Sequence, residues 1–98
     1  YNDPELTAEF KSIAARVLGS ENVVYAEPQM VGEDFSMYGQ TKEDVPTVLF
    51  WLGTVTKEKI EKGDLPGLHS PFYYPEPTKS IETGVEVMTT VLVRSFAK

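Results

Sequence analysis

The longest apolar run of the chain lies at residues 47–55, where Val48 to Leu52 do not alternate with polar residues. An unbroken run of this kind is typical of a strand covered on both faces, as in a parallel sheet. Residues 22–27, with the sequence NVVYAE, predict a shorter strand that Pro28 closes. Two strands joined by a crossover would lie parallel with a right-handed connection.

Helices are expected before and between these strands. Asn2 or Asp3 can cap free N–H groups, and Pro4 suits the first helical position. Apolar residues then recur at helical spacing, and Gly19 supplies a C-terminal stop. A short helix is expected at residues 34–40.

A last helix is predicted at residues 78–98, with Thr78 or Ser80 as its cap. Its apolar residues lie on more than one side, which is typical of a helix that is buried on most sides. One stripe contains Ile81, Val85, Met88, Leu92 and Phe96, and further apolar surface comes from Val87, Val91 and Val93.

The expected fold class is α/β, with the element order α-β-(α)-β-α. The pattern predicts part of a larger three-layer α/β domain, formed by residues 1–98 as a single segment, with two parallel strands and a buried C-terminal helix. So few elements cannot cover both faces of residues 47–55 and all sides of the last helix. The chain should therefore expose apolar surface or form a homo-oligomer.

Composition narrows the classes of function. The chain has 98 residues, 41% of them hydrophobic, and a net charge of −6, which fits one small globular domain. The negative charge disfavours nucleic acid and anionic membrane surfaces as partners. The absence of cysteine excludes a disulfide framework and thiolate chemistry. It also fits a reducing compartment, and we expect a cytoplasmic location.

His69 is the single histidine of the chain and lies in the stretch GLHSPFYYPEP. A loop histidine is most often a surface or structural residue, but it can also be a metal ligand or a base. Gly67 and Pro71 restrict the backbone on either side, and a loop after a buried strand would hold the imidazole at a sheet edge. One imidazole supplies one metal bond, whereas a hydrolytic zinc site needs about three protein ligands.

Glu33 and Asp34, in the stretch MVGEDFS, are the second candidates. Asp34 or Ser36 could simply cap a helix. Alternatively, Gly32 allows a tight turn while an acid faces a cleft, where it would bind a metal, orient a histidine or contact substrate. The aromatic residues after His69 are more often packing than recognition, and the run KEKIEKGD is expected to be solvated surface.

Three ordered motifs, MVGEDFSMYGQ, VPTVLFWLGT and GLHSPFYYPEP, precede an apolar helix. Together they resemble the C-terminal part of the catalytic domain of hippurate hydrolase-like amidohydrolases, which belong to the aminoacylase and carboxypeptidase family of metallopeptidases. The opening YNDPELT is similar to the point where that family's chain re-enters the catalytic domain after an inserted lid and dimerisation domain. The lid and the N-terminal half of the catalytic domain would then lie outside this chain.

The resemblance implies a parent enzyme that hydrolyses the amide bond of N-acyl amino acids or related small amides and peptides. It implies two divalent metal ions, zinc or manganese, in each complete site, and it makes His69 a metal ligand. It places Gly32, Glu33, Asp34 and Phe35 near the active site without assigning a role. The family's other ligands and its general-base glutamate lie N-terminal to the lid, so no catalytic residue is assigned here and the isolated chain is expected to be inactive.

A second class of function remains open on the residues alone. The chain could be a stand-alone, non-catalytic binding or oligomerisation module that shares the fold. Further histidine and acidic ligands upstream would favour the enzyme, whereas a reading frame that starts near Tyr1 would favour the module.

Overall fold

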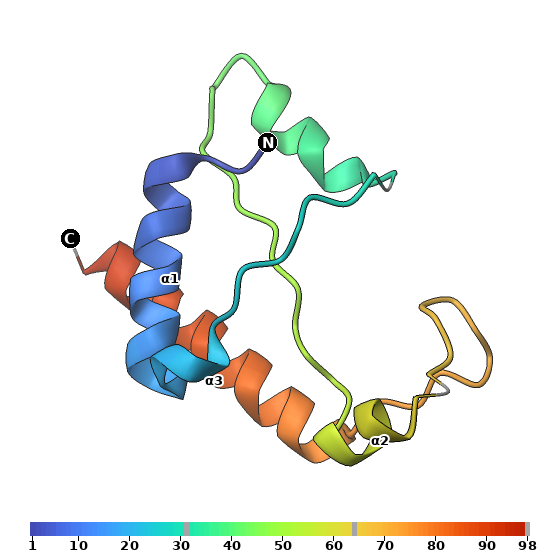
Figure 1. The fold of residues 1–98 in the computed structure, drawn as a ribbon. Coiled ribbons are helices and arrows are strands. Elements are labelled where there is room, and N and C mark those ends of the chain that lie inside the picture. The colour runs from blue at the N-terminus through green and yellow to red at the C-terminus, as the bar shows by residue number, and fades with distance from the viewer. Residues whose placement is uncertain (31, 64, 98) are drawn as a thin grey trace.

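The described chain contains two long helices and three short ones, joined by segments without regular structure. The computed structural model describes residues 1–30, 32–63 and 65–97. The order is α1 (Pro4–Leu18), η1 (Ser20–Asn22), η2 (Asp34–Gln40), α2 (Lys57–Lys62) and α3 (Pro77–Phe96). Figure 1 shows α1 and α3 crossing on one side. One extended segment leads from the end of α1 to η2, and a second leads from η2 to α2. The radius of gyration is 15.2 Å. A compact domain of this length has about 13 Å, so the elements are loosely assembled.

The first helix begins and ends as its local signals predict. The side chain of Asp3 accepts a hydrogen bond from the backbone N–H of Leu6 at 2.8 Å, and Pro4 occupies the first helical position. Gly19 ends the helix with a φ of +86°, a conformation that glycine adopts without steric cost. A short 3₁₀ helix also forms at residues 34–40, as expected.

The core lies where α1 crosses α3. Phe10 and Ala14 of α1 and Val87 of α3 are buried together. The ring of Phe10 lies 4.5 Å from that of Phe50, centroid to centroid, at an interplanar angle of 36°. The partly buried residues packed against this core are Val17, Leu18, Val23, Val48, Phe50 and Val91.

The α/β prediction is wrong, because no strand forms among the described residues. A strand requires a continuous ladder of backbone hydrogen bonds with a neighbouring segment, and no described segment forms such a ladder with residues 47–55. Their hydrogen bonds run to the starts of helices instead, where Asp3 N–H donates to Thr47 at 2.9 Å and Glu76 N–H donates to Thr54 at 2.7 Å. The segment that was expected to form the first strand, residues 22–27, begins inside η1 and continues without regular structure.

Residues 47–55 are also covered on one face only. Val48 and Phe50 pack against the core, whereas Leu49 and Trp51 keep 47% and 55% of their surface exposed. The unbroken apolar run had predicted two covered faces. In the described chain there is no second layer to cover the other one.

The buried C-terminal helix was likewise predicted wrongly. Within the described part of α3, only Ser80 and Val87 are buried. The cap is also different, since the side chain of Glu76 accepts from Lys79 N–H and the hydroxyl of Ser80 donates to the Glu76 carbonyl. Small residues on this face let α3 approach the rest of the chain closely. The larger residues of the predicted stripe are all exposed, namely Ile81, Val85, Met88, Leu92 and Phe96.

None of the helices in the described ranges combines the length and the apolar character needed to cross a membrane.

Candidate functional site

The loop at residues 65–74 contains His69 and is built from two consecutive turns. Ser70 N–H donates to the Gly67 carbonyl at 3.1 Å, and Tyr73 N–H donates to the Ser70 carbonyl at 3.1 Å. The Ser70 hydroxyl also accepts from Phe72 N–H at 3.2 Å. Ser70 therefore belongs to both turns and couples their backbone conformations.

His69 occupies the third position of the first turn with a φ of +69°. This left-handed conformation is rare for residues other than glycine, although histidine tolerates it better than most. Glycine would fill the position at lower cost, and yet Gly67, two residues earlier in the same turn, does not take the positive φ. The turn thus presents an exposed imidazole at a position where the backbone favours glycine.

The C-terminal end of the loop is attached to two other parts of the chain. The hydroxyl groups of Tyr73 and Thr54 share a hydrogen bond, which ties the loop to the end of residues 47–55. The ammonium of Lys59, on α2, donates to the Tyr74 carbonyl at 3.1 Å and lies 4.9 Å from the centre of the Tyr74 ring. These contacts orient the second half of the loop.

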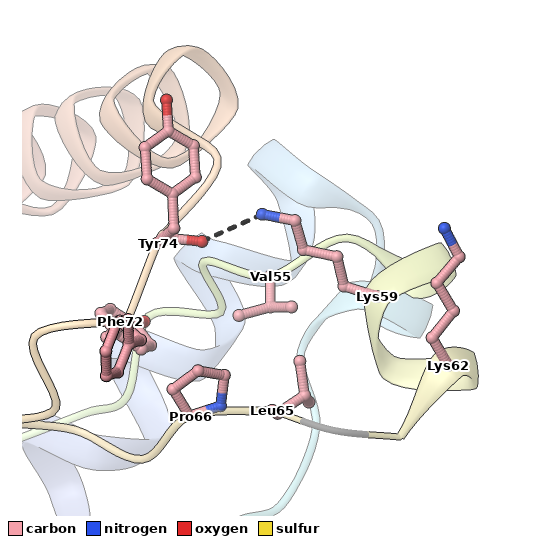
Figure 2. Close-up of a pocket in the computed structure, with 8 residues that line it drawn as sticks. Val55, Lys59, Lys62, Leu65, Pro66, Phe72 and Tyr74 are labelled. Carbon is pink, nitrogen blue, oxygen red and sulfur yellow. Dashed lines mark hydrogen bonds between the residues drawn. The ribbon is translucent and has the colours of Figure 1, made fainter.

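A hollow of about 350 Å³ opens between α2 and this loop. Figure 2 shows Lys59 reaching toward Tyr74, with Val55, Leu65 and Pro66 below it. The volume falls within the range of small-molecule sites, and the mixture of apolar walls and a few polar groups is typical of them. Its lining residues are Val55, Lys59, Lys62, Leu65, Pro66, Phe72, Tyr73 and Tyr74.

The sequence interpretation missed the two lysines of this hollow, because the run KEKIEKGD was expected to be solvated surface. Lys59 and Lys62 are three residues apart on a helix, a spacing that places side chains on one face. This spacing, together with the aromatic residues of the following loop, is the sequence signal from which the two lysines could have been identified as part of a site. Phe72, Tyr73 and Tyr74 line the hollow and do not belong to the buried core.

Glu33 and Asp34 lie at the start of η2 and are exposed. The Glu33 carboxylate accepts from Phe35 N–H at 3.1 Å, and the Ser36 hydroxyl donates to the Glu33 carbonyl at 3.1 Å. The Glu33 carboxylate therefore caps the N-terminus of η2. The sequence had predicted Asp34 or Ser36 as this cap. Figure 1 shows η2 and the loop of His69 in separate parts of the molecule.

The described residues do not fit a complete metal centre. Among residues 1–30, 32–63 and 65–97, no group of three or more His, Cys, Asp or Glu residues is placed to hold a metal ion. A hydrolytic zinc site uses about three protein ligands, and His69 supplies one at most. No catalytic step through a metal follows from these residues alone.

Comparison with known proteins places the chain in a family. The family model described as Peptidase family M20/M25/M40 matches residues 1–94. An N-acetyldiaminopimelate deacetylase of Geobacillus sp. (strain WCH70) is 42% identical over 53 residues. That alignment covers 54% of this chain and 13% of the deacetylase, so the chain aligns with a small part of that relative. No solved structure matches the chain. Because the family match extends over nearly the whole sequence, the chain belongs to peptidase family M20/M25/M40, a family of hydrolases.

Proposed function

We propose that this chain forms part of a metal-dependent amidohydrolase that cleaves the amide bond of N-acyl amino acids or related small amides and peptides. In this proposal residues 65–74 form one wall of the active site, and His69 provides one ligand to a divalent metal, zinc or manganese. The remaining ligands and the general base come from sequence outside these residues.

The observation that carries the proposal is the conformation of His69. Its φ of +69° lies in a region that costs a non-glycine residue roughly 1–3 kcal/mol. Residues held in such conformations cluster at functional sites, where the position of the side chain matters more than backbone stability. The two turns on Ser70 hold the imidazole outward, as a ligand to a site formed with other chain segments would require.

The adjacent hollow supports the proposed class of substrate. An N-acyl amino acid has an apolar portion and a carboxylate. The hollow is lined by apolar side chains and by Lys59 and Lys62, and the Lys59 ammonium donates to the Tyr74 carbonyl. The related deacetylase is named for the removal of an acetyl group from nitrogen, which is the same class of reaction. We propose that the hollow binds part of the substrate, while His69 binds the divalent metal at the amide bond that is cleaved.

The test uses a purified protein that contains this chain within a complete family enzyme. We expect hydrolysis of N-acetyl amino acids, and His69→Asn should reduce both the bound metal and the turnover. Leu68→Ala is the matched control, because Leu68 is an exposed neighbour in the same turn. Unchanged metal content and turnover in the His69→Asn protein would remove His69 from the site.

The alternative, a non-catalytic binding or oligomerisation module, predicts a different result in the same assay. A module would show no hydrolysis of any N-acyl amino acid when all of its natural sequence is present. The experiment therefore separates an enzyme from a module before any variant is made.

A further inference from the structure

The ammonium of Lys59 makes two contacts with Tyr74. Its Nζ donates to the Tyr74 carbonyl at 3.1 Å and lies 4.9 Å from the centre of the Tyr74 ring, within the range of a cation–π interaction (Figure 2). Lys59 is half-buried, whereas Lys57 and Lys62 on the same helix are exposed. A single ammonium therefore fixes both the backbone and the ring of Tyr74.

This contact closes the part of the chain that contains His69. Lys59 and Tyr74 are 15 positions apart, and His69 lies between them. Holding the ends of such a segment together removes conformational freedom from the residues between them. The contact therefore restricts the positions that the imidazole can reach relative to α2.

A second anchor lies beside the first. The hydroxyl groups of Tyr73 and Thr54 share a hydrogen bond, and the Thr54 carbonyl accepts from Glu76 N–H at 2.7 Å. Tyr73 N–H donates to the Ser70 carbonyl at 3.1 Å, and Ser70 directly follows His69. One turn of backbone thus connects this end of the loop to His69.

We propose that Lys59 is a positioning residue, which fixes the location of the His69 imidazole by holding Tyr74. This inference rests on the proposed function, in which His69 binds a divalent metal. A bond between zinc and a histidine nitrogen is about 2.0–2.1 Å long, so a small displacement of the loop weakens it. Although Lys59 and Lys62 both line the hollow, the inference assigns the orientation of the loop to Lys59 and substrate binding to Lys62.

The test uses a complete family enzyme that contains this chain, with zinc as the metal. Lys59→Met keeps an unbranched side chain and removes the ammonium. Zinc affinity should fall by roughly tenfold, the lower end of the loss seen when a group that orients a metal ligand is removed. The kcat for an N-acetyl amino acid should fall as well, while KM stays within about twofold. Lys59→Arg keeps a donor and a cation near the ring, so it should restore most of the zinc affinity and of kcat.

Three further variants separate positioning from other roles. Lys57→Met removes the same charge from the same helix at a residue that does not line the hollow, and it should change neither quantity. Lys62→Met should raise KM and leave the zinc affinity unchanged. Tyr73→Phe removes only the hydroxyl that contacts Thr54, so it loosens the loop without altering α2 and should also weaken zinc binding. All measurements are made at a temperature at which thermal unfolding shows each variant to be folded.

A double variant shows whether Lys59 acts through His69. Adding Lys59→Met to His69→Asn should cause no further loss of zinc affinity, because the ligand that Lys59 positions is already absent. Additive losses, an unchanged zinc affinity in the Lys59→Met enzyme, or a rise in KM alone would overturn the inference while the proposed function stands. A His69→Asn enzyme that retains its zinc would instead overturn the proposed function, and this inference with it.

Discussion

The side-chain amide of Asn2 makes both of the hydrogen bonds with Leu49 that a neighbouring strand would make. Its Nδ2 donates to the Leu49 carbonyl at 2.8 Å, and its Oδ1 accepts from Leu49 N–H at 2.9 Å. A single side chain thus takes the place of a strand partner at one residue of the extended segment. It also joins the start of α1 to a residue 47 positions later in the chain.

The first prediction concerns this pair. Asn2→Ala removes two side-chain hydrogen bonds, each of which contributes about 0.5–1.5 kcal/mol, so the free energy of unfolding should fall by about 1–2 kcal/mol. Asn2→Asp should also destabilise, because a carboxylate cannot donate to the Leu49 carbonyl. Chemical denaturation followed by tryptophan fluorescence measures both changes, since Trp51 lies two residues from Leu49.

Gln29→Ala is the control for that measurement. The Gln29 side chain donates one hydrogen bond, to the nearby Glu27 carbonyl. It connects no distant parts of the chain, so its loss should change stability by less than about 0.5 kcal/mol. Equal effects of the two alanine substitutions would show that the bond between Asn2 and Leu49 does not hold the segment in place.

The second prediction concerns Gly84 in the middle of α3. Alanine is preferred to glycine in a helix interior by about 1 kcal/mol, and the added Cβ would lie 3.3 Å from Cδ2 of Leu52. Because Leu52 is partly exposed, its side chain can move by the small distance required. We expect Gly84→Ala to raise the free energy of unfolding by about 0.5–1 kcal/mol.

Gly39→Ala should have the opposite effect in the same assay. A Cβ there would lie 2.8 Å from Oγ1 of Thr47, and the Thr47 carbonyl accepts from Asp3 N–H. Thr47 is therefore less free to move than Leu52. Destabilisation by Gly84→Ala would mean that Leu52 is held more firmly against α3 than its exposure indicates.

The local signals predicted helix boundaries better than they predicted the fold. Asp3, Pro4 and Gly19 act within one helix turn of their own positions, so the bounds of α1 follow from sequence alone. A strand depends on a second segment, and the apolar run at residues 47–55 carries no information about whether one is present. The run indicated that the segment favours burial, and in the structure Val48 and Phe50 are partly buried against the core.

The apolar stripe of α3 shows the same limit. Periodicity identified Ile81 and Leu92 as one face, but the face that packs in the described chain contains Ser80 and Val87. Val87 and Val91, which pack at the core, had been assigned only to further apolar surface, because the longer stripe through Ile81 and Leu92 has more members. At the candidate site, the sequence singled out His69 but could not show that the residue would take a positive φ. It also could not show that Lys59 would meet Tyr74, because that contact depends on how the loop folds back.

The third prediction separates stability from function at His69. His69→Gly should stabilise the fold by about 1 kcal/mol, because glycine adopts a positive φ without the steric cost. His69→Ala keeps a Cβ and should bring no such gain. If the imidazole is a ligand in the complete enzyme, both variants should lose activity although only one of them gains stability.

Gly63→Ala is the reciprocal control. Gly63 has a φ of +87°, and a Cβ at that position would meet no described atom within 4 Å. Its replacement should therefore destabilise by about 1 kcal/mol through backbone conformation alone. A His69→Gly protein that is less stable than the original would show that the histidine side chain supports the loop.

The fourth prediction concerns Lys62 at the edge of the hollow. In a complete enzyme, Lys62→Met should raise KM for an N-acyl amino acid by about two- to fivefold, the range expected for an exposed charge pair. It should leave kcat unchanged, because the contact is equally strong in the ground state and the transition state. Lys57→Met is the matched control, since Lys57 lies on the same helix but does not line the hollow.

The last prediction concerns the 98-residue chain by itself. It should not hydrolyse N-acyl amino acids, and it should bind zinc no better than a single exposed histidine does. The reason is the number of ligands, because His69 supplies one bond and the described acids do not gather around it. Titration calorimetry measures the affinity for zinc, and the His69→Ala chain gives the background binding.

Tight stoichiometric zinc binding that disappears in the His69→Ala chain would show that the chain assembles a metal site of its own. The added ligands would then be sought at Glu33 and Asp34, or in a second copy, and the requirement for further sequence would fail.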